Sequence, residues 1–219
     1  MPKSDFLKLL HKKMNEVEFM KSFTQFPPHC YVRENDLVLQ IIYFDPGSAG
    51  FDCTLAVQPL IIHDFGELVF NFGIILGHYA KLGFQRWPYG NAKQETNQKI
   101  EESIVAIEKF GLPWFEKVDS KEKIVKYPED GTIICPPHWR SLYRGYCALY
   151  IGQIDKGIKW LQQSISYYKT LKYDHAQKRV LEMTELIDTA RNKPNQLREY
   201  LNAIAEDNRQ KIYSSQLKN

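Results

Sequence analysis

Residues 138–171 constrain the fold of this chain more than any other segment. Their sequence is HWRSLYRGYCALYIGQIDKGIKWLQQSISYYKTL. Small residues recur along it at Gly145, Ala148, Gly152, Gly157 and Ser164. This spacing lets two antiparallel helices approach closely around a tight turn at residues 152–155. The segment therefore predicts a helical hairpin, and it implies no reaction.

The hairpin resembles a degenerate tetratricopeptide repeat. The small and glycine positions of that family map onto Gly145, Ala148, Gly152, Gly157 and Ser164, and its large hydrophobic position maps onto Leu161. Three features depart from the family: Gly157 stands where Ala is usual, Lys169 replaces the terminal Pro, and no second clean copy follows. About three repeats are needed for a self-standing solenoid. We therefore expect the hairpin to dock on the N-terminal sheet or on the last two helices.

The N-terminal part predicts one helix followed by a sheet. A helix is expected over residues 4–21, with Ser4 as its N-cap and apolar residues at helical spacing. Short runs of alternating or β-branched residues, separated by turn residues, predict four strands. They are expected over residues 29–33, 37–44, 51–57 and 67–76. The short turns between them favour an antiparallel meander.

The middle of the chain predicts a loop, a helix and a boundary. Residues 77–94 are expected to form an irregular loop, and a helix over 95–110 is expected to end at Gly111. Pro113 suits the start of a short helix. Further helices are expected over residues 175–191 and 195–213. A connector over residues 127–137 is expected to separate a sheet domain, residues 1–130, from a helical region, residues 137–219. The predicted fold class is α+β.

Composition limits the classes of partner. The 219 residues are 43% hydrophobic and 25% charged, with 29 basic and 26 acidic residues and a net charge of +3. Such a weak excess does not predict a nucleic-acid partner, which requires a clustered basic face. Acidic and basic residues alternate, as over residues 117–123, which favours a solvated, salt-bridged surface. The frequent aromatic residues favour a well-filled core.

The lack of a predicted signal peptide and the pattern of cysteines favour a cytoplasmic protein without membrane contact. The first residues lack an apolar run of signal-peptide length, and the apolar runs are too short to span a bilayer. No two cysteines form a CxxC pair, so we expect free thiols and neither metal nor cofactor. A zinc site built from His29, Cys30, Cys53 and His63 is the alternative that we weighed. Buried, apolar behaviour of Cys30 and Cys53 is the favoured interpretation.

No catalytic motif stands out. His63 and Asp64 are adjacent, but neighbouring side chains on an extended segment point to opposite faces. The glycine-rich residues 45–50 lack the pattern of a phosphate-binding loop and are expected to form a hairpin turn. We therefore assign no catalytic residue.

Two clusters combine aromatic and basic residues, as binding hot spots do. The seven partner-binding candidates are Arg86, Trp87, Tyr89, Trp139, Arg140, Tyr143 and Arg144. At helical spacing Arg140 and Arg144 share a face and would clamp a carboxylate of an acidic partner. The alternative is structural: Trp87 would cap the sheet, Trp139 would pack inward, and the two arginines would be solvated.

The predicted function is non-enzymatic protein binding. Residues 4–118, with Trp114 and Phe115 after a later helix, are similar to small bacterial α+β proteins, and several families of that kind neutralise secreted toxins. The resemblance implies an immunity protein whose partner is a toxin. Two alternatives stay open. One is an enzyme with a site assembled from His63, Asp64, His78 and Arg86, and the other is a structural homodimer built through the terminal helices.

Overall fold

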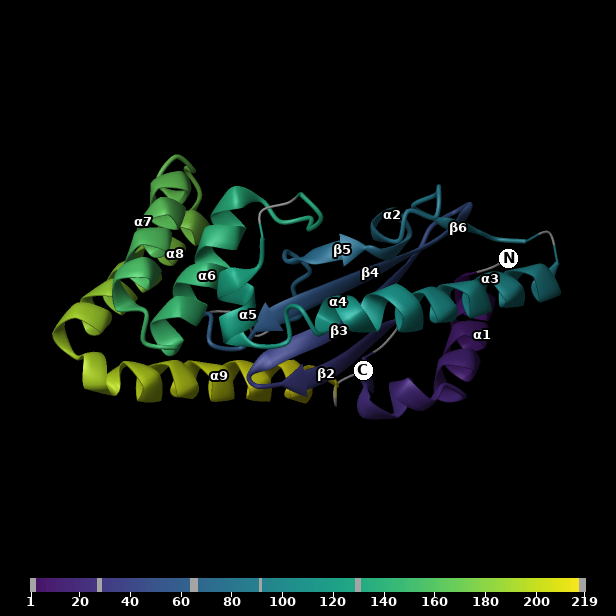
Figure 1. Cartoon of the computed structure of the whole chain (residues 1–219), viewed down its shortest axis with the longest axis horizontal. Helices are drawn as coiled ribbons and strands as arrows, with labels where there is room; N and C mark the ends of the chain where they lie inside the picture. Colours follow the sequence, from purple (N-terminus) through teal and green to yellow (C-terminus); the bar gives the residue numbers. More distant parts are fainter. Residues whose placement is uncertain (1–2, 27–28, 64–66, 91, 129–130, 217–219) are drawn as a thin grey trace.

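The computed structural model describes residues 3–26, 29–63, 67–90, 92–128 and 131–216. It confirms the α+β class: an N-terminal helix, a sheet of antiparallel strands and a helical C-terminal region follow one another (Figure 1). Within these ranges no helix is both long and apolar enough to cross a bilayer.

The sheet follows the predicted meander. Its strands lie in chain order and pair antiparallel: β1 (Thr24–Phe26), β2 (Cys30–Asn35), β3 (Val38–Pro46), β4 (Gly50–Pro59) and β5 (Gly73–Ile75). A sixth, β6 (Trp87–Pro88), pairs with the start of β4. The four predicted strands correspond to β2–β5, although β5 is much shorter than expected. Sequence reasoning missed β1 and β6, because two or three residues carry no periodic pattern.

Helix α1 (Lys3–Asn15) is shorter than predicted, and the chain continues as a 3-10 turn, η1 (Glu18–Ser22). Phe6, Leu10 and Met14 form the buried stripe of α1. The Phe6 ring lies 4.8 Å from that of Phe51 on β4. The helix therefore packs its apolar face on the sheet, as helical spacing requires.

The predicted loop over residues 77–94 contains a short helix, α2 (Leu76–Tyr79), as well as β6. Helix α3 (Lys93–Ala106) then runs through a π turn, η2 (Ile107–Gly111), into α4 (Leu112–Phe115) and lies across the sheet (Figure 1). The expectation that Gly111 ends the helix is wrong, because its φ of −72° is helical. A Cβ there would lie 2.6 Å from Leu55 Cδ1, so glycine allows close packing on β4.

A buried lysine is the exception to the solvated, salt-bridged surface that was expected over residues 117–123, where Lys123 pairs with Asp119 at 2.9 Å. Lys121 begins α5 (Lys121–Lys126), and its side chain is only 2% exposed. Its Nζ donates to the Asp36 carbonyl at 2.6 Å and pairs with the Asp36 carboxylate at 2.7 Å. Asp36 and Leu37 form the β2–β3 turn, and both have positive φ, a rare conformation for leucine. Lys121 thus holds a strained turn in place.

Helices dominate after residue 137, as predicted. They are α6 (Pro137–Tyr150), α7 (Ile154–Tyr168), α8 (Asp174–Asn192) and α9 (Pro194–Gln216). Helices α6, α7 and α8 gather at one end of the molecule, and α9 runs back beside β2 (Figure 1). The Phe72 and Tyr143 rings stack 5.4 Å apart, so the sheet and the helical region share a core.

The predicted hairpin is α6 and α7, and its glycines lie where the helices meet. A Cβ on Gly145 would lie 2.6 Å from Leu161 Cδ2, and one on Gly157 would lie 2.6 Å from Leu149 Cδ2. Gly152 has φ of +81° at the turn, a conformation that glycine adopts without strain. The prediction of close helix approach is confirmed.

Replacing Gly157 by leucine should destabilise this contact. The added side chain has no room, since the Gly145 carbonyl would also lie 3.0 Å from its Cβ. We expect the free energy of unfolding to fall by about 1–3 kcal/mol, measured by chemical denaturation. The control is Lys156→Leu, which places the same side chain on the exposed face of α7. Gly131→Ala is a poorer control, because the positive φ of Gly131 would strain alanine even though the surrounding space is open. Equal stability of Gly157→Leu and wild type would contradict the assignment.

Candidate functional site

Trp87 is a core residue, which corrects its assignment to an exposed binding surface. Its side chain has no exposed surface. Its ring lies parallel to that of Phe51, at 5.8 Å and 13°, and meets the edge of Phe84 at 5.3 Å. The structural alternative is therefore confirmed: the loop folds back, and Trp87 caps the sheet next to β4.

Arg86 and Tyr89, which flank this strand, are partly exposed. The Arg86 guanidinium holds both carboxylate oxygens of Asp52, with Nη2 at 2.7 Å and Nε at 3.2 Å. Hydrogen bonding to this carboxylate raises the pKa of Arg86. The Tyr89 ring packs 5.4 Å from that of Phe6. The arginine fork is thus already occupied by a carboxylate of the same chain.

The second aromatic-basic cluster is divided between core and surface. Tyr143 is fully buried, and Arg144 is 8% exposed. Arg144 donates from Nη2 to the carbonyl oxygen of Tyr127, and its guanidinium lies 5.7 Å from the Trp160 ring. Tyr143 and Arg144 therefore hold the connector and the core together, which corrects their assignment to a partner surface.

Trp139 and Arg140, at the start of α6, keep partial exposure. The Trp139 ring meets those of Tyr143 and Tyr168 edge-on at 6.4 Å. A partner-binding role for both residues stays a prediction. The structure does not join this cluster to the first, since α6 and β6 lie at different ends of the sheet (Figure 1).

The dispersed enzyme site does not assemble from the residues that the structure describes. His63 follows the end of β4, and its ring nitrogens lie 2.8 Å from the Tyr146 hydroxyl and 2.9 Å from the Tyr200 hydroxyl. Arg86 is bound at the other end of β4 through Asp52. Asp64 lies outside the described residues. The ring of His63 thus links the sheet to α6 and α9.

The four cysteines are free thiols and are buried. Burial raises the pKa of Cys30 to about 12 and raises that of Cys53 as well. Both thiols are therefore protonated at neutral pH, which disfavours metal binding and nucleophilic attack. Over the described ranges, no three His, Cys, Asp or Glu side chains converge as metal ligands would.

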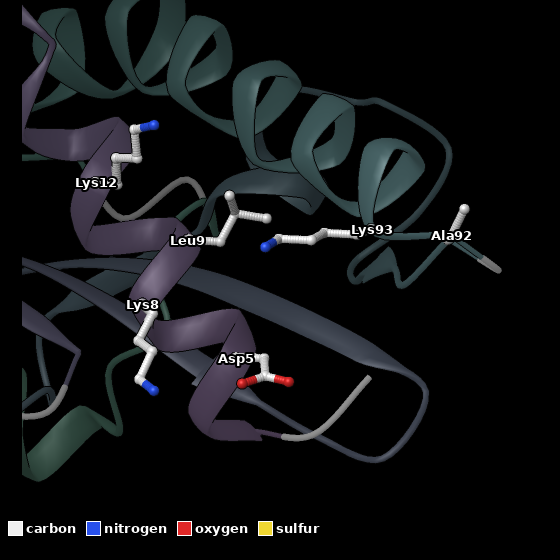
Figure 2. A pocket seen from close by; sticks show the side chains of 7 residues that line it. Asp5, Lys8, Leu9, Lys12, Ala92 and Lys93 are labelled. Atoms are coloured by element: carbon white, nitrogen blue, oxygen red, sulfur yellow. The ribbon is translucent and has the colours of Figure 1, made fainter.

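A large hollow of about 510 Å³ lies between α1 and the start of α3. Its lining side chains include Lys8, Lys12 and Lys93, with Asp5 as an acidic neighbour. Figure 2 shows Lys93 reaching across towards Leu9, whereas Lys8 extends away from it. The ammonium groups do not converge on one point, so this hollow has no arrangement for a specific anion.

A second hollow, of about 480 Å³, lies between the loop after α2 and the outer side of α3. We call it the α3 groove. Its lining residues are Leu82, Phe84, Trp87, Gln98, Glu101, Glu102, Val105 and Ala106. Phe84 is 39% exposed and Val105 is 58% exposed, although both are apolar. The groove therefore presents an apolar surface to solvent above a buried tryptophan.

Local structure explains how the two walls form. Lys81 and Gly83 have positive φ, which turns the chain sharply after α2 and carries Phe84 outward. A Cβ on Gly77 would lie 2.5 Å from the Phe84 carbonyl oxygen, so the loop packs directly on α2. On α3, positions 98, 101, 102 and 105 recur at helical spacing and share one face.

Sequence reasoning missed Phe84 and Val105. One signal was present: Val105 is apolar but lies off the buried stripe of Ile100, Ile104 and Ile107. A single exposed valine is ordinary on a protein surface. Only the tertiary structure shows that it shares a hollow with Phe84.

Two glutamates give the α3 wall its charge. Glu101 lies 2.8 Å from Lys13 of α1, and Glu102 lies 2.8 Å from Lys99 one turn earlier. Hydrogen bonding from Lys13 lowers the pKa of Glu101, so this carboxylate is ionised at neutral pH. The apolar groove is therefore bordered on one side by two carboxylates, each of which is paired with a lysine outside the lining.

No protein-family model, curated protein or solved structure matches the chain.

Proposed function

We propose that the protein binds another protein through the α3 groove and acts without catalysis. The observation that supports this is the exposure of Phe84 and Val105 on opposite walls of one hollow. Exposed apolar side chains that border a concave surface are typical of interaction sites, because burying them on binding is favourable. Isolated exposed residues such as Leu181 on α8 carry no such implication.

The shape of the groove favours a protein segment as its occupant. One wall is a helix face with residues at i, i+3, i+4 and i+7, and the other is a loop with an aromatic side chain. Grooves of this kind receive an amphipathic segment whose apolar side chains anchor it. At the floor, the Trp87 ring packs against the rings of Phe51 and Phe84.

Toxin neutralisation is the form of protein binding that we favour. The groove residues fall within residues 4–118, the part whose resemblance to small bacterial α+β proteins implies such a role. A neutralising protein needs a surface that covers its partner, and it needs no reactive group of its own. The α3 groove offers a surface of this kind, and binding there requires no reactive side chain.

The test compares two variants that replace an exposed apolar residue by aspartate. Proteins captured from the native host are purified, and their affinities for wild type, Val105→Asp and Leu181→Asp are measured by calorimetry. We expect Val105→Asp to weaken the dissociation constant of the true partner at least about tenfold, since it places a charge in the apolar contact. Leu181→Asp is the control, because Leu181 is similarly exposed on a different helix.

A captured protein that binds wild type and Val105→Asp equally would contradict the use of the groove. The melting temperatures of both variants should stay close to that of wild type, because both positions are exposed. This comparison separates loss of binding from loss of folding.

A further inference from the structure

The wall that α3 contributes to the groove is acidic next to its apolar part. Gln98, Glu101 and Glu102 line it together with Val105, and the lining includes no basic residue. Two carboxylates therefore stand beside the surface on which an apolar anchor would rest. A ligand that fills the groove must place some of its own groups against this charge.

These carboxylates remain accessible in the free protein. Glu102 is paired with Lys99 of its own helix, and the two side chains are 37% and 33% exposed. Glu101 is paired with Lys13, and its side chain is 50% exposed. Exposed pairs of this kind are weak because water screens them. A cation from a partner can therefore bind these carboxylates beside the lysines, or in their place, at little cost in free energy.

We propose that the segment bound in the α3 groove carries a large apolar side chain flanked by arginine or lysine. The apolar side chain lies between Phe84 and Val105, and the flanking cation meets the carboxylate of Glu102. Arginine suits this position best, because its planar guanidinium binds a carboxylate through two parallel hydrogen bonds. This inference rests on the proposed function, and it specifies the chemistry of the partner.

The opposite chemistry is disfavoured at the same place. An acidic segment would bring its carboxylates close to Glu101 and Glu102, and like charges in contact suppress binding. Lysine side chains line the other hollow, between α1 and the start of α3, whereas the charged residues that line the α3 groove are glutamates. Charge thus distinguishes the two hollows and selects a basic segment for the α3 groove.

The experiment uses the full chain and a phage-displayed library of random dodecapeptides. Peptides selected on wild type are synthesised, and their dissociation constants are measured for wild type, Val105→Asp, Glu102→Gln and Glu108→Gln. Glu108 is the matched control, because it is exposed on the following turn and its substitution removes the same charge outside the groove. Each measurement is repeated at higher salt concentration.

We expect the selected peptides to share an aromatic or large aliphatic residue next to arginine or lysine. Their affinity should fall about three- to tenfold in Glu102→Gln, remain unchanged in Glu108→Gln, and weaken with salt. Peptides that are sensitive to Val105→Asp but lack basic residues and ignore Glu102→Gln would overturn this inference and leave the proposed function standing. If no selected peptide is sensitive to Val105→Asp, both proposals fall.

Discussion

Replacing Trp87 by alanine should lower the free energy of unfolding by about 3–5 kcal/mol. The side chain is fully buried and stacks on Phe51, so its removal leaves a cavity between β4 and the groove. Chemical denaturation followed by circular dichroism measures the loss, since the substitution also removes a fluorophore. A change of this size would establish that Trp87 stabilises the fold and does not serve primarily as a contact for a partner.

Phe84→Ala is the matched control for that measurement. Phe84 touches the same tryptophan ring but is 39% exposed, so its truncation should cost much less stability. We expect it to weaken partner binding instead. If Trp87→Ala unfolds at the same denaturant concentration as wild type, the packing described for this loop is incorrect.

Replacing Asn208 by leucine should lower the free energy of unfolding by about 2–6 kcal/mol. The Asn208 side chain is fully buried on α9, and its Nδ2 donates to the Leu60 carbonyl at 2.6 Å and to the Ile62 carbonyl at 2.7 Å. Leucine has a similar size but no donor, so two buried carbonyl oxygens would lose their partner, each at a cost of about 1–3 kcal/mol. The free energy of unfolding measures this loss.

Asn202→Leu is the comparison within the same helix. Asn202 is exposed, and it accepts one hydrogen bond, from the Tyr150 hydroxyl at 2.9 Å. Water replaces such a bond, so we expect a change below about 1 kcal/mol. Equal effects of the two substitutions would show that Asn208 does not hold α9 against the segment that follows β4.

The contacts of that segment join the helical region to the sheet. Besides Asn208, the His63 ring bonds the hydroxyls of Tyr146 and Tyr200, and Arg179 donates to the His63 carbonyl oxygen. Three of the C-terminal helices thus meet one stretch of chain after β4. The α6–α7 hairpin was expected to dock on the sheet or on the last two helices, and α6 contacts both sides: Tyr146 bonds His63 after β4, and the Tyr150 hydroxyl donates to Asn202 of α9.

Elements with a local signal could be predicted from the amino-acid pattern alone. The hairpin followed from small residues at helical spacing, and β2, β3 and β4 followed from alternating or β-branched runs between turns. Each of these patterns repeats within one element, so it needs no knowledge of what lies opposite. For the same reason, the two-residue strand β6 and the continuation of α3 through Gly111 escaped prediction.

The burial of individual aromatic and basic side chains could not be predicted, because it depends on contacts between segments that are distant in the chain. The sequence patterns suggested that the side chains of Trp87, Arg144 and Lys121 are exposed. Each of them is nevertheless buried against an element that is distant in the chain. Phe84 and Val105 are left exposed in one hollow by the same arrangement. Burial depends on which distant segment packs against a residue, and the spacing of its sequence neighbours does not carry that information.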